Sequence, residues 1–592
     1  TLTDAVIVAL DSEYVLPIYN PYTPDELKQK LEGQELPPEF LEPRKPFRTF
    51  CIACQNNVAR WKPDRPIQIQ ELCGWILTNL TNWNIDFKGK RIFVSAHYLL
   101  SELQHIVDLK TVMTKIRTYG SGLYGETLFE PDRWSNYNPS GYKVELEHEQ
   151  TKFVFVDTYV LFGMSLEKLT TGTPYEKPRD TEIWNGQPWS YWRRNPHLLF
   201  EKDEAKFWKY AEGDVLGLEW CVKYWREWIW NKWSIDILRA KTFSNMAFRI
   251  FQSRIEEPTE PYIRKQFLSK RGRPRTELIF DLSKECLRRF YLLGYKAGRR
   301  EIYERGLQTE PVYAYDVSKE YTTAAIMQPL PNAHTKFIQI TDQDDLEQYE
   351  GMVDVNFEFP DTVQTPCLPV VDERFPKQIY PRKGHTVCGV AEVRLAKKLG
   401  AKTYIVNSYV FKPTSEEINH PIRQFLEDVL KIANEDKGTP TETFMKNIAN
   451  GLIGKLFQRN RLEAHEEKWV EQVWRVAKSW SPILASLILS RARAIYGELL
   501  TLATPVYGHT DSLFTKTPID LNAPIIQTLK QYGSEGLKLE AEFKTLWTPR
   551  SACYYGETKD GRIKTARHGI PSEPEQFIKA IESKIGNQNA QD

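Results

Sequence analysis

Residues 506–514, VYGHTDSLF, place a small polar cluster between two apolar runs. Apolar and aromatic residues on both sides of a short polar turn predict a β-hairpin whose tip presents Asp511. Such a tip is typical of a metal-dependent turn, except that His509 stands two residues before its only aspartate. The segment therefore predicts a sheet-containing domain with a carboxylate site at a tight turn, and it raises the question of what replaces the second acid.

A second group of acids lies near the start of the chain. The segment DAVIVALDSEYV predicts an apolar strand that ends in Asp11, Ser12 and Glu13. Residues two apart in a strand point to the same face, so the Asp11 and Glu13 side chains are expected to project together. Acids at strand ends are common, and this pair alone would not indicate a site.

Two further segments add to this group. RIFVSAHYLLSELQHI predicts a strand that runs into a helix, with Glu102 on its first turn, and KFWKYAEGDVLGLEWC predicts a helix in which Tyr210 and Asp214 share one face. Acids from separate elements are suited to holding two divalent cations, with the tyrosine ordering an attacking water. The alternative is a set of solvated acids and a core tyrosine.

A third group lies in the second half of the chain. EPVYAYDVSKEYTTAAIMQPLP predicts a strand that delivers Asp316, followed by a helix carrying Tyr321. TETFMKNIANGLIGKLF predicts a helix with Lys446, Asn450 and Gly454 on one broad face. Taken singly, Lys446 is more often a surface lysine and Tyr321 a core aromatic.

Composition limits the class of protein. The 592 residues are 41% hydrophobic and 27% charged, which is typical of several globular domains. No apolar run is long enough to cross a bilayer and TLTDAVIVAL lacks the pattern of a leader, so an intracellular, cytoplasmic protein is expected. Cys51 and Cys54 have no second pair nearby, and RTFCIACQNNVARW predicts a strand rather than a zinc site.

The net charge of +1 does not by itself indicate nucleic-acid binding. Local clustering matters more, and residues 261–275 contain six Lys or Arg and no acid. The loop SKRGRPR within this segment, with Lys270, Arg271 and Arg273, is expected to contact phosphates near a template rather than to read a minor groove.

The three acidic segments of the first half resemble, in order, the exonuclease motifs of the proofreading domain in family B DNA polymerases. The resemblance implies catalytic and metal-binding roles for Asp11, Glu13, Glu102 and Asp214, and a catalytic role for Tyr210. The middle motif departs from the family pattern, because Tyr98 and Glu102 replace its Asn and Asp. Residues 157–169, DTYVLFGMSLEKL, resemble the segment that joins the second and third motifs.

The later segments resemble the family's polymerase motifs. The resemblance implies that Asp316 and Asp511 bind the catalytic metals. Tyr321, Lys446, Asn450 and Gly454 would contact the incoming nucleotide. YKAGRREIY resembles the element between the two halves, and with the C-terminal segment it implies DNA contacts by four residues: Tyr295, Gly298, Arg299 and Tyr554.

Several positions depart from these polymerase motifs. Lys319 and Glu320 stand where the family has Ser and Leu, Ile453 replaces a Tyr, and Ala552 replaces the lysine of the primer-contact element. His509 replaces the first acid of the hairpin and would act as an outer group on a metal-bound water. The expected result is weaker metal binding with activity retained.

The implied fold is α/β and α+β multidomain, with a ribonuclease H-like 3′–5′ exonuclease domain followed by a right-hand polymerase. The predicted boundaries are given by residue number: exonuclease 1–225; basic, Trp-rich connector 226–294; palm 295–420 with room for an insertion, and 483–550; fingers 421–482; small thumb 551–592.

The implied activity is DNA-templated DNA synthesis with proofreading, in viral or mobile-element replication in a bacterial or archaeal host cell. The implied cofactors are two Mg²⁺ or Mn²⁺ ions per active site, and the implied partners are primer–template DNA and deoxynucleoside triphosphates, with a monomeric protein. Length and layout resemble the protein-primed phage and linear-plasmid polymerases, which favours a terminal priming protein as a further partner. The alternatives are an exonuclease, or a DNA-binding replication factor, with a degraded polymerase site.

Overall fold

The computed structural model describes residues 4–15, 47–103, 106, 143–178, 181–240, 243–253, 262–268, 274–280, 285–332, 335–342, 344–371, 378–414, 421–457, 459–460, 475–476 and 481–567. The chain divides into two compact units. Unit 1 comprises Thr1–Ile250 with Glu435–Ile448, and unit 2 comprises Phe251–Asn434 with Ala449–Asp592. Among the described residues, no helix is both long and apolar enough to cross a membrane.

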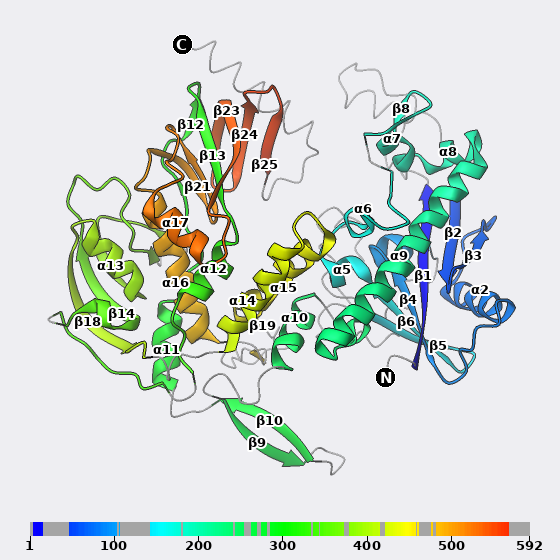
Figure 1. Cartoon of the computed structure of the whole chain (residues 1–592), viewed down its shortest axis with the longest axis horizontal. Helices are drawn as coiled ribbons and strands as arrows, with labels where there is room; N and C mark the ends of the chain where they lie inside the picture. The colour runs from blue at the N-terminus through cyan, green and yellow to red at the C-terminus, as the bar shows by residue number, and fades with distance from the viewer. Residues whose placement is uncertain are drawn as a thin grey trace, which may run out of the picture. The chain divides into compact units, whose positions relative to one another are not determined.

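Unit 1 is built on a six-stranded mixed sheet with the order β3-β2-β1-β4-β6-β5 (Figure 1). Strands β1, β4 and β6 are parallel, and β2 runs antiparallel to β1. Its strands are β1 (Ala5–Val15), β2 (Phe47–Cys54), β3 (Asn57–Trp61), β4 (Arg91–Ala96), β5 (Lys143–His148) and β6 (Thr151–Asp157), with the short pair β7 (Ile183–Trp184) and β8 (Gln187–Pro188) outside the sheet.

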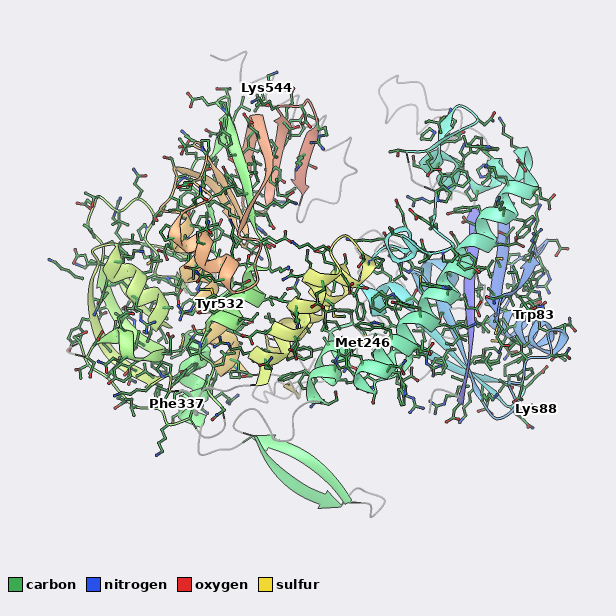
Figure 2. The ribbon with its side chains drawn as sticks, viewed as in Figure 1. Trp83, Lys88, Met246, Phe337, Tyr532 and Lys544 are labelled. Atoms are coloured by element: carbon green, nitrogen blue, oxygen red, sulfur yellow. The ribbon has the colours of Figure 1, made fainter. Side chains whose placement is uncertain are left out.

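Helices cover both faces of this sheet. The helices of this unit are α2 (Ile69–Asn82), α3 (Leu99–Leu103), α5 (Thr158–Phe162), α6 (Leu166–Thr170), α7 (Trp189–Arg194), α8 (Pro196–Lys202), α9 (Glu204–Trp233) and α10 (Phe243–Gln252), with a 3₁₀ turn at Ile237–Arg239, and α2, α3, α8 and α9 contact the sheet. Val6, Val8 and Leu10 of β1 pack on the α2 side, where Trp83, labelled in Figure 2, closes the core. Because strand side chains alternate, the odd-numbered residues of β1 face the opposite side, where α9 crosses β1.

Unit 2 contains an eight-stranded sheet in which β13 lies between β22 and β23. Its strands are β11 (Arg300–Ile302), β12 (Gly306–Gln308), β13 (Val312–Val317), β21 (Pro505–His509), β22 (Ser512–Thr515), β23 (Leu537–Arg550), β24 (Cys553–Thr558) and β25 (Ile563–Arg567). Lys544 of β23 is labelled in Figure 2. Helices α11 (Glu285–Leu293), α12 (Glu320–Met327), α16 (Pro482–Leu499) and α17 (Pro524–Gln531) also belong to this unit, and α12 and α17 both contact α16.

A separate small sheet lies between the two halves of the large sheet in sequence. It has the order β17-β14-β18, with β14 (Glu350–Glu358), β17 (Lys383–Gly389), β18 (Lys402–Phe411) and helix α13 (Val390–Lys398). The remaining elements are the hairpin β9 (Tyr262–Leu268) and β10 (Pro274–Phe280), the pairs β15 (Val370–Val371) with β16 (Gln378–Ile379) and β19 (Arg459–Asn460) with β20 (Arg475–Val476), a 3₁₀ turn at Leu346–Gln348, and helices α14 (Pro421–Glu435) and α15 (Pro440–Phe457).

A buried ion pair joins the small sheet to the large one. Arg493 of α16 donates to Glu392 of α13 at 2.8 Å, and both side chains are at most 1% exposed. Glu392 also accepts from the Ser490 hydroxyl, while Arg493 donates to the Lys296 carbonyl. Because removing one partner would leave an uncompensated buried charge, this network fixes α13, α16 and the segment before β11 against one another.

The predicted local elements agree with the structure. The hairpin at 506–514 is formed by β21 and β22, the strand and helix around Asp316 and Tyr321 are β13 and α12, and the helix carrying Lys446 is α15. The segment around Cys51 and Cys54 is a strand, β2, in which both thiols are buried. Helix α9 continues past the predicted boundary at residue 225 to Trp233.

Candidate active sites

The first site forms where β1 meets α9 in unit 1. Asp11 and Glu13 lie on the face of β1 that α9 covers, and Asp214 faces them from the helix. One ligand oxygen from each of these three residues lies within 4.8 Å of the others. Oxygen donors from carboxylates at this spacing fit a hard divalent cation such as Mg²⁺ or Mn²⁺. The structure therefore brings together three of the four predicted metal ligands.

Without a bound cation, the carboxylates of this cluster repel one another. Burial and the Asp214 carboxylate raise the pKa of Asp11 to about 7. Burial and the charges of Asp11 and Asp214 raise the pKa of Glu13 well above its usual value. One Asp11 oxygen, Oδ2, is buried with no hydrogen-bond partner in the part of the chain that the structure describes. An orphaned carboxylate oxygen among acids is the environment that a bound metal ion would satisfy.

Lys177 supplies positive charge to the cluster, and it was not predicted from sequence. Its amine lies 2.5 Å from Asp214 Oδ2 and 5.1 Å from the centre of the Tyr210 ring. Burial lowers its pKa, but Asp214 and Asp11 outweigh burial, so the pKa of Lys177 is raised. The residue lies in the irregular segment PYEKPRD, where no periodicity or spacing marks it.

Glu102 lines the same cavity, and its predicted role as a metal ligand stays a prediction. It lies on α3 and its Oε2 accepts hydrogen bonds from the Ser12 amide and the Ser12 hydroxyl, both at 2.6 Å. Burial and the charge of Asp11 raise the pKa of Glu102 well above its usual value. It is not one of the three acids whose ligand atoms lie within 4.8 Å of one another. In this geometry Glu102 holds the strand between Asp11 and Glu13.

Glu102→Ala is expected to lower degradation of single-stranded DNA by more than about 10-fold, because groups that orient metal ligands matter by 10–100-fold. The measurement is the initial rate of 3′-end release from a labelled oligonucleotide. Glu212→Gln is a suitable control, since Glu212 lies on α9 but pairs with Arg60 at 2.6 Å outside the cavity. A loss smaller than 10-fold for Glu102→Ala would remove Glu102 from the site.

The carboxylates open into a cavity of about 650 Å³. Its wall includes His97, Tyr98, Ser165, Leu166, Arg193 and Tyr210 as well as the acids and Lys177. Tyr210 packs edge-on against Trp189 with ring centres 5.3 Å apart, which orients its hydroxyl end. Tyr98 is 41% exposed and stacks on Tyr159 at 4.3 Å with the planes 23° apart. Its backbone is left-handed, with φ of 63°, a strained conformation that is often found at functional sites.

His97 next to it is neutral. Its Nδ1 lies 3.1 Å from the Thr158 hydroxyl, which itself donates to the Ala96 carbonyl, so Nδ1 carries the proton. Burial lowers the pKa of His97 to about 3. Asp157 caps α5 and accepts from the Leu99 amide, which connects the segment 157–169 to the start of α3. These contacts explain why two segments 60 residues apart form one wall.

The second site lies at the centre of the large sheet in unit 2. Asp316 of β13 is directly opposite Ser512 of β22, and the Val317 amide donates to the Asp511 carbonyl at 2.8 Å. Asp316 therefore lies in β13, and Asp511 lies in the hairpin turn immediately before the adjacent strand β22. Burial and the Asp511 carboxylate raise the pKa of Asp316 to about 6, with a smaller contribution from Glu540. Two adjacent carboxylates fit divalent cations as the first site does.

The hairpin tip is held in a fixed geometry. Thr510 has φ of 57°, its hydroxyl lies 2.8 Å from Asp511 Oδ1, and its amide donates to the Arg299 carbonyl at 2.8 Å. His509 is opposite Arg300 in β11. Under the hairpin, the Tyr496 hydroxyl donates to the Ser512 carbonyl at 2.7 Å and occupies the space that a side chain at Gly508 would need.

Tyr321 lies beside this hairpin. A Cβ on Gly298 would lie 2.3 Å from the Tyr321 hydroxyl and 3.2 Å from Thr510, so only glycine allows this approach. Gly298 was predicted to contact DNA. Its close packing provides a second reason for the residue, because it lets the element at 295–303 touch both Tyr321 and the hairpin.

The structure corrects one predicted DNA contact. The Arg299 side chain is 1% exposed, donates to Glu301 at 2.6 Å, and lies over the Tyr380 ring at 4.0 Å. Its guanidinium is therefore unavailable to DNA. The DNA contact was implied by the resemblance of YKAGRREIY to a family element. Glu301 and the distant Tyr380 bury Arg299, whereas the neighbouring Arg300 is exposed.

The predicted nucleotide contacts on α15 lie on one helix. Lys446 is 34% exposed and pairs with Glu442 at 2.5 Å. Asn450 is exposed, with its Oδ1 3.5 Å from the Thr322 hydroxyl, and a Cβ on Gly454 would meet nothing within 4 Å. Their predicted roles toward a nucleotide remain predictions.

The remaining predicted DNA contacts are more widely spread. Tyr295 is half-buried after α11. Tyr554 of β24 packs on the Phe514 ring at 5.1 Å and on Phe543, so its ring already contributes to a core. Lys270, Arg271 and Arg273 lie outside the described residues, between β9 and β10.

The profile of the family described as "DNA polymerase type B, organellar and viral" matches residues 173–460. The matched segment is slightly less than half of the chain. A curated protein, the "Primer-independent DNA polymerase PolB" of Escherichia coli, is 27% identical over 252 residues, which is 40% of this chain. The match spans 29% of the length of that relative.

Solved structures with the same fold include complexes of the Phi29 DNA polymerase. The complex with primer–template DNA and incoming nucleotide substrates has a TM-score of 0.57 at 12% identity, and covers 97% of this chain and 93% of that one. The complex with single-stranded DNA has a TM-score of 0.56, also at 12% identity and the same coverage. The predicted fold, an exonuclease domain followed by a right-hand polymerase, is thereby confirmed.

Proposed function

We propose that the chain is a DNA-templated DNA polymerase that adds deoxynucleotides to a primer 3′ end and removes mismatched ends with a 3′–5′ exonuclease. The observation that carries the proposal is the presence of a separate carboxylate centre in each unit, Asp11–Glu13–Asp214 and Asp316–Asp511. The match of residues 173–460 to a family of DNA polymerases and the fold shared with a polymerase support it. Primer–template DNA and deoxynucleoside triphosphates are the proposed substrates.

The polymerase chemistry is proposed to take place at Asp316 and Asp511. Divalent cations at such a pair would supply charge neutralisation for phosphoryl transfer and lower the pKa of the primer hydroxyl. The two aspartates would hold the ions, since Asp316 is opposite Ser512 and Asp511 directly precedes that residue. Tyr321, confined by Gly298, would form the surface beneath the incoming sugar. Lys446 and Asn450 are proposed to contact the nucleotide.

The exonuclease chemistry is proposed to take place at the Asp11 cluster. Asp11, Glu13 and Asp214 would hold cations that activate water. Tyr210, oriented by Trp189, would order that water, and the exposed ring of Tyr98 would stack on a terminal base. Lys177 keeps positive charge at Asp214 and would stabilise charge on the scissile phosphate.

The experiment that tests the function is extension of a labelled primer on a defined DNA template with Mg²⁺ or Mn²⁺. The expected result is template-directed extension that stops when one required nucleotide is omitted. Degradation of the primer without any extension under all metal conditions would instead support an exonuclease with an inactive polymerase site.

We further propose that the sheet β17-β14-β18 with α13 serves initiation. These elements lie in the insertion between Asp316 and Lys446, and a sequence relative is named a primer-independent polymerase. The same template should be supplied with a DNA primer, an RNA primer or no primer. A product that stays linked to protein after denaturation would indicate a terminal priming protein, and a free product would indicate synthesis from nucleotides alone. A requirement for an added nucleic-acid primer would contradict this part of the proposal.

A further inference from the structure

Glu320 is a buried acid in the polymerase site that the proposed mechanism leaves unused. It is the first residue of α12 and follows Lys319, whose backbone is left-handed with φ of 58°. Glu320 follows Asp316 by four residues and is only 3% exposed. Its Oε2 is buried and has no hydrogen-bond partner among the described residues.

The groups that act on this carboxyl are acids. Burial raises the pKa of Glu320 well above its usual value, and the charges of Asp511 and then Asp316 raise it further. The adjacent Lys319 does not neutralise it, because its amine donates to Asn434 at 2.7 Å. The nearby Tyr496 hydroxyl donates its hydrogen bond to the Ser512 carbonyl. A buried carboxyl that faces two carboxylates without a cation is unfavourable in the isolated protein.

The same site has lost an acid elsewhere. In the hairpin, position 509 holds His509 rather than the aspartate of the family pattern, whereas position 320 holds a glutamate rather than a leucine. His509 lies two residues before Asp511, and the charge of Asp511 acts on the Glu320 carboxyl. One removes a negative charge from the hairpin and the other introduces a carboxyl from the helix.

We propose that Glu320 is the third carboxylate of the polymerase site and replaces, from α12, the charge missing at position 509. The inference rests on the proposed polymerase function of Asp316 and Asp511. Glu320 is not within ligand spacing of both aspartates, so it acts as an outer group through the cations they hold. Divalent cations would be the largest local charges, and they favour the ionised form of a nearby carboxyl.

The test measures metal binding directly. In an Asp11→Ala/Glu13→Ala background, which disables the exonuclease cluster, Mn²⁺ binding is titrated by electron paramagnetic resonance with and without Glu320→Gln. The substitution is expected to weaken Mn²⁺ binding by about 10-fold, as for other groups that support metal ligands. Adding His509→Asp to Glu320→Gln is expected to restore most of the affinity, because it returns the charge to the hairpin.

Glu540→Gln is the matched control, since Glu540 also acts on Asp316 but is exposed and pairs with Lys538 at 2.6 Å. It should change Mn²⁺ affinity by less than about 2-fold, because exposed charges are screened. Thermal melting of each variant separates metal binding from folding. If Glu320→Gln fails to fold, His509→Asp alone decides the question, and it should tighten Mn²⁺ binding.

Unchanged Mn²⁺ affinity in folded Glu320→Gln, or no recovery with His509→Asp, would overturn the inference. For His509→Asp alone, an unchanged affinity would overturn it as well. These results are independent of extension: a protein that binds Mn²⁺ through Glu320 but never extends a primer would refute the proposed function instead.

Discussion

Asp316→Asn is expected to lower primer extension by about 10³-fold or more while degradation of single-stranded DNA continues. The substitution keeps the shape of the side chain but removes one of the two charges that β13 and the adjacent hairpin turn bring together. Metal ions contribute several kcal/mol to transition-state stabilisation, and about 4 kcal/mol corresponds to a 10³-fold change in rate. The measurement is single-turnover extension of a labelled primer at saturating nucleotide.

Glu557→Gln provides the control for Asp316→Asn. Glu557 is a carboxylate of β24 in the same sheet, but it forms a loose 3.7 Å pair with Lys544 on the surface. Its loss should alter extension by no more than about 2-fold, because surface ion pairs contribute little. Extension at the wild-type rate by Asp316→Asn would place the polymerase site elsewhere.

The double substitution Asp11→Ala/Glu13→Ala is expected to abolish degradation, by about 10³-fold or more, and to leave extension robust. Both residues belong to the three-carboxylate cluster on the face of β1 that α9 covers, so their loss leaves Asp214 as the only acid of that cluster. The readouts are loss of the 3′-terminal nucleotide from single-stranded DNA and extension of a matched primer, measured on the same preparation.

Glu212→Gln, on the same helix as Asp214, should preserve both activities and show that a change of net charge is not responsible. If the double variant neither degrades nor extends although it melts like the parent protein, the hypothesis of a degraded polymerase site is favoured. Continued degradation would show that the carboxylates of β1 are not the exonuclease centre.

Local patterns were sufficient to predict the elements that carry both sites. The alternation of β1 places Asp11 and Glu13 on one face, and helical spacing places Tyr210 and Asp214 on one side of α9. The hairpin around Asp511 follows from apolar runs that flank a polar turn. In each case the interactions that decide the geometry lie within a few residues, where backbone periodicity applies.

Contacts between distant residues could not be predicted in the same way. Ser12 and Glu102 are 90 residues apart, and the sequence did not predict the hydrogen bonds by which Glu102 supports β1. Lys177 reaches Asp214 from a loop without periodicity. Arg299 was expected to face DNA, but its burial depends on Tyr380, which is far away in sequence.

Glu320 illustrates an intermediate case. The sequence identified the departure from the family pattern at this position, but a glutamate in the first turn of a helix is usually solvated. The proposed role of Glu320 depends on its burial and on the absence of a hydrogen-bond partner for Oε2 among the described residues. Both properties are set by tertiary packing, which the local sequence pattern does not describe.

The pairing of β13 with β22 also affects how much sequence change the second site tolerates. Opposite residues of neighbouring antiparallel strands keep their Cβ atoms about 4.5–5.5 Å apart through main-chain hydrogen bonds. Asp316 is opposite Ser512, and Asp511 directly precedes Ser512 in the turn, so main-chain pairing brings the two acidic residues close together. Substitutions nearby can redistribute charge, as at positions 320 and 509, while the scaffold that sets the spacing stays the same.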